Sequence, residues 1–92
     1  MTEIVAEFYD INTNDLINRN RKQEIVKPRQ IAMYLMREEL KSSYPFIGQK
    51  LGGRDHTTAI YACNKIEEEI KNNNDLEQEL NLIKERLYSE PL

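Results

Sequence analysis

The sequence has few of the residues that crosslink or break a chain. Its 92 residues include one cysteine, Cys63, which excludes an intramolecular disulfide and suits a reducing, cytoplasmic setting. No apolar run approaches the ~20 residues that a membrane-spanning helix needs. Acidic rather than basic residues stand near the N-terminus, which is not typical of a secretory signal peptide. A chain of this length fits one domain, and we expect that domain to be cytoplasmic.

Strand-like alternation is also missing, whereas apolar residues recur at helical spacing. All three glycines lie between Gly48 and Gly53, and the prolines stand at positions 28, 45 and 91. Between these breaks we predict an all-α domain. The expected elements are a helical stub over 2–9, a short helix opening at 12–15, a loop over 18–23, a helix with Pro28 in its first turn running to about Lys41, a short helix starting near Pro45, a helix running to about Asn72, and a last helix opening at Asn74 or Asp75.

Local signals fix several ends of these helices. Ser43 can cap the short helix near Pro45, and Asp55 can cap the helix after it. The pair Gly52-Gly53 is expected to end the short helix, with at least one glycine at positive φ. The expected apolar stripes, including Cys63 as a core residue, are Ile31, Ala32, Leu35 and Leu40; Phe46, Ile47 and Leu51; Ala59, Ile60, Cys63, Ile66 and Ile70; and Leu76, Leu80, Ile83 and Leu87.

Positive charge is concentrated in the middle of a chain whose net charge is −3. Between Leu16 and Lys65, ten lysines and arginines stand against four acidic residues, a local charge of +6. The rest of the chain holds three basic and twelve acidic residues, or −9. Because charges act over about 10 Å at physiological salt, the middle of the chain is the candidate surface for a polyanion. The acidic C-terminal third should face away from it.

A short helix, a glycine turn and a longer helix are typical of a helix-turn-helix. In that motif the first turn of the second helix reaches base edges in the major groove. Here the corresponding run is Arg54-Asp55-His56-Thr57-Thr58, which is polar and offers groups with distinct base preferences. The apolar residues of this helix begin only at Ala59, so its first turn can stay exposed.

Three segments carry a resemblance to a known family. They are Pro28-Arg29-Gln30-Ile31-Ala32-Met33-Tyr34-Leu35, Pro45-Phe46-Ile47-Gly48, and Gly52-Gly53-Arg54-Asp55-His56-Thr57-Thr58-Ala59-Ile60-Tyr61-Ala62-Cys63. Together they resemble the C-terminal DNA-binding domain of bacterial DnaA, the chromosomal replication initiator, over roughly residues 4–88. The resemblance implies a Trp-repressor-like helical domain that binds double-stranded DNA at DnaA boxes. It also implies that residues 1–10 end a connecting helix and residues 11–92 form the helix-turn-helix domain.

The resemblance assigns a role to several residues. Arg21, in the loop before Pro28, matches the family's minor-groove arginine, although Arg19 or Lys22 could serve instead. An arginine suits a narrow A·T minor groove because the potential there is most negative. The base contacts expected are Arg21, Asp55, His56, Thr57 and Pro45, the last beside Tyr44. The phosphate contacts expected are Lys27, Arg29, Gln30, Arg37, Arg54 and Thr58.

The same resemblance limits what else the chain is expected to do. The family's ATPase module has no counterpart here, so we expect no enzymatic activity and no cofactor, with ATP belonging to that module alone. The single histidine also lacks a nucleophile–base arrangement around it. Protein regulators of initiation are a further possible class of partner. Two alternative functions are a protein-interaction module that uses the stripe of the last helix and, less favoured, a membrane contact through the basic face.

Overall fold

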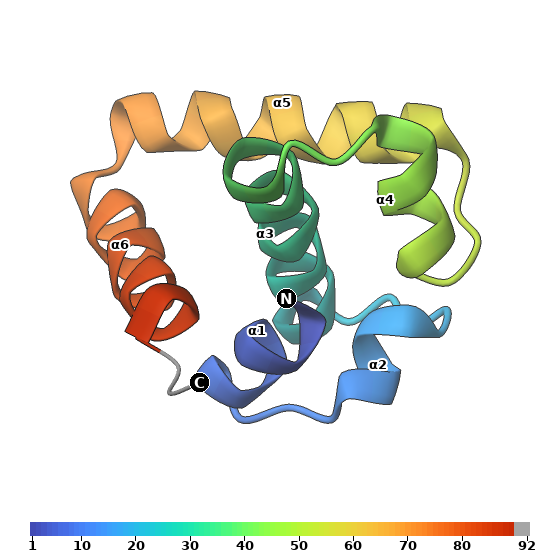
Figure 1. The fold of residues 1–92 in the computed structure, drawn as a ribbon, viewed down its shortest axis with the longest axis horizontal. Coiled ribbons are helices and arrows are strands. Elements are labelled where there is room, and N and C mark those ends of the chain that lie inside the picture. Colours follow the sequence, from blue (N-terminus) through green and yellow to red (C-terminus); the bar gives the residue numbers. More distant parts are fainter. Residues whose placement is uncertain (90–92) are drawn as a thin grey trace.

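A computed structural model describes residues 1–89, and over that range the chain is helical, with no strand. This confirms the all-α prediction. The helices are α1 (Thr2–Phe8), α2 (Thr13–Ile17), α3 (Gln23–Leu40), α4 (Tyr44–Lys50), α5 (His56–Asn72) and α6 (Asn74–Ser89). In Figure 1, α3 runs through the centre and α5 crosses the top of the molecule, with α6 on one side and α4 on the other. The two short helices α1 and α2 lie below them.

One hydrophobic core draws residues from every helix. Among its fully buried side chains are Val5, Leu16, Ile31, Leu35, Ile47, Leu51, Ile66 and Ile83. Cys63 belongs to this core, as predicted, and burial raises the pKa of its thiol to about 11. The stripe of α6 at Leu76, Leu80 and Ile83 is buried in the same core, so it is not available to a separate partner.

The first helix shares this core. Val5 and Ala6 of α1 are both buried in it. The division of the chain at residue 10 stays a prediction, but α1 packs as part of the domain. Along residues 1–89, no helix is long and apolar enough to cross a membrane.

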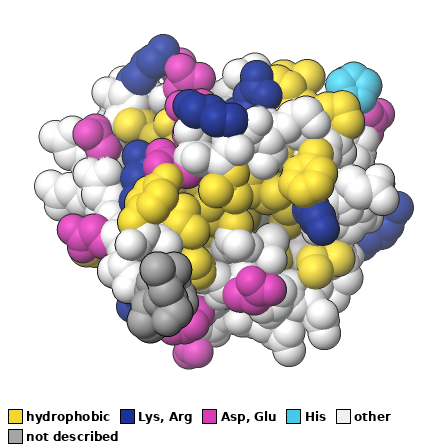
Figure 2. Space-filling view, viewed as in Figure 1, with side chains coloured by type: hydrophobic (Ala, Val, Ile, Leu, Met, Phe, Trp, Pro, Cys, Tyr) yellow, Lys and Arg dark blue, Asp and Glu magenta, His cyan; other side chains and the backbone are white. Residues whose placement is uncertain are grey.

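Leu40 departs from the predicted buried stripe, because 49% of it is exposed. It lies in the last turn of α3, beside an open groove that Phe46 and Met1 also line. Figure 2 shows hydrophobic side chains across the middle of this face, over α1, α3 and α4. Phe46, expected in the stripe of its helix, is likewise 47% exposed. Helical spacing thus placed both residues on an apolar face that the neighbouring helices cover only in part.

The start of α3 also differs from the prediction. The helix begins at Gln23, so Pro28 lies in its second turn and not in its first. The carbonyl of Lys22 accepts hydrogen bonds from the amides of Ile25 and Val26, at 2.9 and 2.8 Å, which closes the first turn without Pro28. Because Ile25 and Pro28 are both buried, packing favours continuing the helix through a residue that cannot donate a backbone hydrogen bond.

Both predicted helix caps, Ser43 and Asp55, are present, and Asn12 caps α2 as well. The side chains of Asn12, Ser43 and Asp55 each accept a hydrogen bond from a backbone amide in the first turn of the helix that follows. The last helix begins at Asn74, one of the two expected positions, and the side chain of Asn73 caps it. These local polar signals therefore determine where four of the helices start.

Candidate nucleic-acid interface

The turn between α4 and α5 depends on glycine at close contacts. Gly52 and Gly53 have φ of 93° and 71°, which confirms the predicted positive φ. A Cβ on Gly52 would lie 1.9 Å from the carbonyl oxygen of Ile17, and one on Gly48 would lie 2.2 Å from that of Arg54. The glycines therefore let the end of α2 and the start of α5 approach the end of α4.

The first turn of α5 presents its polar side chains to solvent. Asp55, His56, Thr57 and Thr58 are all exposed. The Oδ1 atom of Asp55 accepts a hydrogen bond from the amide of Thr57 at 3.3 Å and lies 2.9 Å from Nδ1 of His56. This carboxylate thus caps the helix and contacts the His56 ring, while Oδ2 takes part in neither contact. The arrangement suits a surface that reads hydrogen-bonding groups.

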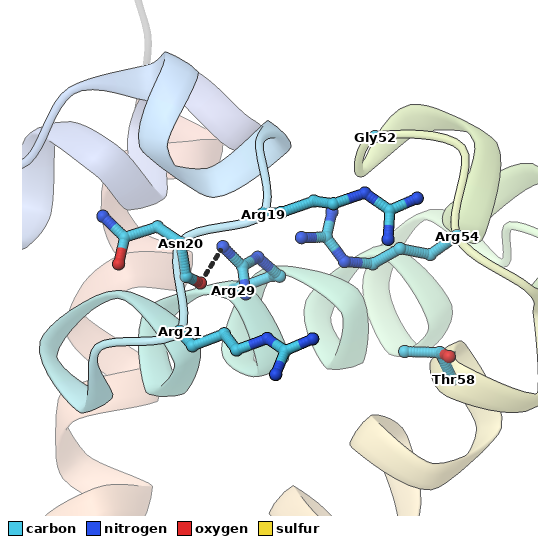
Figure 3. Close-up of a pocket in the computed structure, with 7 residues that line it drawn as sticks. All are labelled: Arg19, Asn20, Arg21, Arg29, Gly52, Arg54 and Thr58. Carbon is cyan, nitrogen blue, oxygen red and sulfur yellow. Dashed lines mark hydrogen bonds between the residues drawn. The ribbon is translucent and has the colours of Figure 1, made fainter.

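The structure brings the loop before α3 and the start of α5 together around one cavity of about 280 Å³. We call it the arginine cavity, and its lining residues are Arg19, Asn20, Arg21, Arg29, Gly52, Arg54 and Thr58. In Figure 3, Arg21 extends from the 18–22 loop toward Thr58, while Arg19 and Arg54 gather beside Arg29. Two parts of the predicted site that lie far apart in the sequence are therefore neighbours.

Arg29 is buried, with 7% of its surface exposed. Its Nε donates to the carbonyl of Leu16 at 2.8 Å. Its Nη2 donates to the carbonyls of Asp15, Asn18 and Asn20 at 2.9–3.1 Å. Burial, with the nearby charge of Arg54, lowers the pKa of Arg29. Arg29 therefore has a structural role that we did not predict, and its contact with phosphate stays a prediction.

Arg54 makes a similar set of contacts from the other side of the cavity. Its guanidinium donates to the carbonyls of Ile17 at 2.9 Å, Asn18 at 2.6 Å, and Leu51. Burial, with the nearby charge of Arg19, lowers the pKa of Arg54. Arginines that repel one another are thus held together by backbone oxygens.

Sequence reasoning named Arg19 only as an alternative to Arg21, and it missed the contribution of Asn20 to the cavity wall and the burial of Arg29. A signal for the burial was present in the sequence. Arg29 follows Ile25 by four residues and precedes Met33 by four, so it lies on the buried stripe of α3. A basic residue on such a stripe needs buried acceptors, which here are backbone carbonyls.

The other predicted contact residues lie outside the arginine cavity. Lys27 forms an ion pair with Glu69 on α5. Arg37 donates to the carbonyl of Ser42 at 3.0 Å, and its guanidinium lies 4.2 Å from the centre of the Tyr44 ring. Pro45 is exposed in the first turn of α4.

Gln30 differs from these residues because its amide oxygen is inside the protein. Its Oε1 is buried and accepts no hydrogen bond from the residues that the structure describes. The proposed contacts of Gln30, Lys27, Arg37 and Pro45 with DNA stay predictions.

Comparison with known proteins identifies the family. Residues 1–66 match the family described as bacterial DnaA protein helix-turn-helix. The chain belongs to this family. That model is of a helix-turn-helix domain and not of an enzymatic domain, and the match confirms the resemblance drawn from the three motifs. Family membership supports a DNA-binding role for this chain.

Individual relatives agree with this assignment. The chain is 54% identical over 85 residues to the chromosomal replication initiator protein DnaA of Roseiflexus castenholzii, and 52% identical to that of Chloroflexus aggregans. It is 48% identical to the DnaA of Limosilactobacillus reuteri. Each match covers 92% of this chain but only 18–19% of the relative. The chain therefore spans less than a fifth of the length of these relatives.

Proposed function

We propose that this chain binds double-stranded DNA sequence-specifically at DnaA boxes of a replication origin. The first turn of α5 enters the major groove, and the 18–22 loop enters the adjacent minor groove. Asp55, His56 and Thr57 contact base edges from α5, and Arg21 contacts them from the loop. The relatives are named chromosomal replication initiator proteins, which supports the biological setting.

The observation that carries the proposal is the arginine cavity. It joins four arginines from the 18–22 loop, α3 and the turn before α5 to Thr58 in the first turn of α5. Burial is the main cause of the lowered pKa values of Arg29 and Arg54, and repulsion adds to it, from Arg54 on Arg29 and from Arg19 on Arg54. An anion beside the cavity would relieve that repulsion. The DNA backbone supplies such anions on both sides of each groove.

The proposal also includes the remaining predicted contacts. Pro45 lies in the first turn of α4, the first helix of the motif, where it can approach thymine methyl groups. We assign phosphate contacts to Lys27, Gln30, Arg37 and Thr58. Arg29 and Arg54 join them only if their guanidinium groups can serve phosphate and backbone carbonyls together.

Selection of bound duplexes from a random pool tests this function directly. We expect the chain to enrich one short motif that includes an A·T-rich flank, the form of site that the 18–22 loop would read. Recovery of unrelated sequences would mean that the chain binds DNA without specificity. No enrichment over a bead control would contradict the proposal altogether.

A further inference from the structure

Two side chains of the arginine cavity, Arg29 and Arg54, bond backbone carbonyls in a way that suggests a role beyond the proposed contact with DNA. We infer that Arg29 and Arg54 are positioning residues that fix the 18–22 loop against the first turn of α5 and thereby set the spacing between minor-groove and major-groove contacts. This inference rests on the proposed function.

Helix α2 has only five residues, and the carbonyls at a helix end have no donor within the helix. The two arginines supply those donors. Arg29 bonds the carbonyls of Asp15 and Leu16, and Arg54 bonds that of Ile17. Cations are also favoured at a helix C-terminus by the helix dipole. The end of α2 is thus held by two side chains from distant parts of the sequence.

The same contacts continue into the loop. The carbonyl of Asn18 accepts from both arginines, and that of Asn20 accepts from Arg29 at 2.9 Å. The side chain of Asn18 accepts from the amide of Asn20 at 3.2 Å, and the side chain of Asn20 accepts from that of Lys22 at 3.0 Å. These are two successive Asx turns. Arg21 lies between their anchored ends, so the loop is ordered without DNA.

Arg54 connects this loop to the start of α5. It belongs to the turn just before α5 and also bonds the carbonyl of Leu51, which ends α4. One guanidinium therefore links α2, the loop and the helix-turn-helix. Lysine carries the same charge but concentrates its donors on one nitrogen, so it cannot take the places of the two guanidinium nitrogens that each arginine uses. Lysine variants hence separate the charge of these residues from their geometry.

The test compares Arg29→Lys and Arg54→Lys with the wild-type chain on two duplexes. One is the selected site, and the other has its A·T flank moved by one base pair. Wild type should prefer the native spacing by roughly 5- to 150-fold, the range for one changed base pair. Both variants should lose most of that preference while the dependence of affinity on salt stays the same. Arg86→Lys is the matched control, because Arg86 lies on α6 over the Phe8 ring.

Hydrogen exchange of the free protein provides a second measurement. The amides of Asn20 and Lys22 should exchange faster in both variants than in wild type or Arg86→Lys. If Arg29→Lys does not fold, Arg54→Lys carries the test, because Arg54 is only partly buried.

Several results would overturn the inference. Unchanged spacing preference and unchanged exchange in folded variants would do so. So would a shallower salt dependence with the preference retained, since that identifies phosphate contacts. Failure of wild type to bind duplex DNA would instead contradict the proposed function, and the exchange data would still test whether the two arginines order the loop.

Discussion

Replacing Gly52 with alanine should destabilise the domain far more than replacing its neighbour Gly53. Both residues have positive φ, which costs an alanine about 1–2 kcal/mol. At Gly53 a Cβ meets no atom within 4 Å, so that cost stands alone. At Gly52 the Cβ would lie 1.9 Å from the Ile17 carbonyl oxygen and 2.7 Å from Nη1 of Arg54. Because the backbone at Ile17 must move to make room for this Cβ, overpacking adds about 1–3 kcal/mol to the loss of stability at Gly52.

The expected loss is therefore about 2–5 kcal/mol for Gly52→Ala and about 1–2 kcal/mol for Gly53→Ala. Urea unfolding followed by circular dichroism measures both free energies of unfolding. In a domain of this size each kcal/mol lowers Tm by roughly 4–8 °C, so thermal unfolding resolves the difference as well. Equal losses in the two variants would refute the reasoning, because they would mean that α2 and the turn are not in close contact.

Three further predictions concern the residues proposed to contact bases and the contact between α3 and the C-terminal helix α6. Alanine at His56 or Thr57 should weaken binding to the selected duplex by roughly 1–3 kcal/mol and binding to random DNA very little, and equal losses would limit these residues to backbone contacts. Arg21→Ala should weaken binding most at sites with an A·T-rich flank. If replacing that flank with G·C lowers the affinity of the mutant as much as that of wild type, the minor-groove role is wrong. The Tyr88 hydroxyl donates to Glu39 at 2.7 Å and, with the charge of Lys84, lowers the pKa of that carboxyl below 4.5. The ionised Glu39 carboxyl therefore stabilises the fold above the pKa that it has in the unfolded chain, and this stabilisation is lost as pH falls through its folded pKa. Glu39→Gln should lower Tm at pH 7 but not at pH 3. An equal decrease in Tm at both pH values would contradict this role.

Local signals in the sequence were sufficient to predict most of the fold. The caps at Asn12, Ser43 and Asp55 were predictable because a side-chain oxygen bonds an amide two or three residues away. The glycine turn was predictable because glycine, which has no Cβ, tolerates positive φ wherever it stands in the sequence. The start of α3 was not, since packing of Ile25 overrides the ordinary preference of proline for a first turn.

The site was predictable in its parts but not in its assembly. The resemblance supplied Arg21, and the helix-turn-helix pattern supplied Thr58 independently. Their common cavity arises from tertiary contacts that no spacing in the sequence reveals. The resemblance assigned Arg29 to a phosphate, and its burial was not predicted, because the carbonyls at the end of α2 that accept its hydrogen bonds are brought to it by tertiary packing.

The dependence of duplex affinity on salt tests the central claim most directly. If Arg21, Lys27, Arg29, Arg37 and Arg54 all neutralise phosphates, log affinity against log salt should have a slope of about −4 to −5. Arg37→Gln should make that slope shallower by about 1 on selected and random duplexes alike. Lys84→Gln should leave it unchanged, because Lys84 lies on α6 beside Glu39. A slope near zero, or equal effects from Lys84 and Arg37, would contradict DNA binding through the basic middle of the chain.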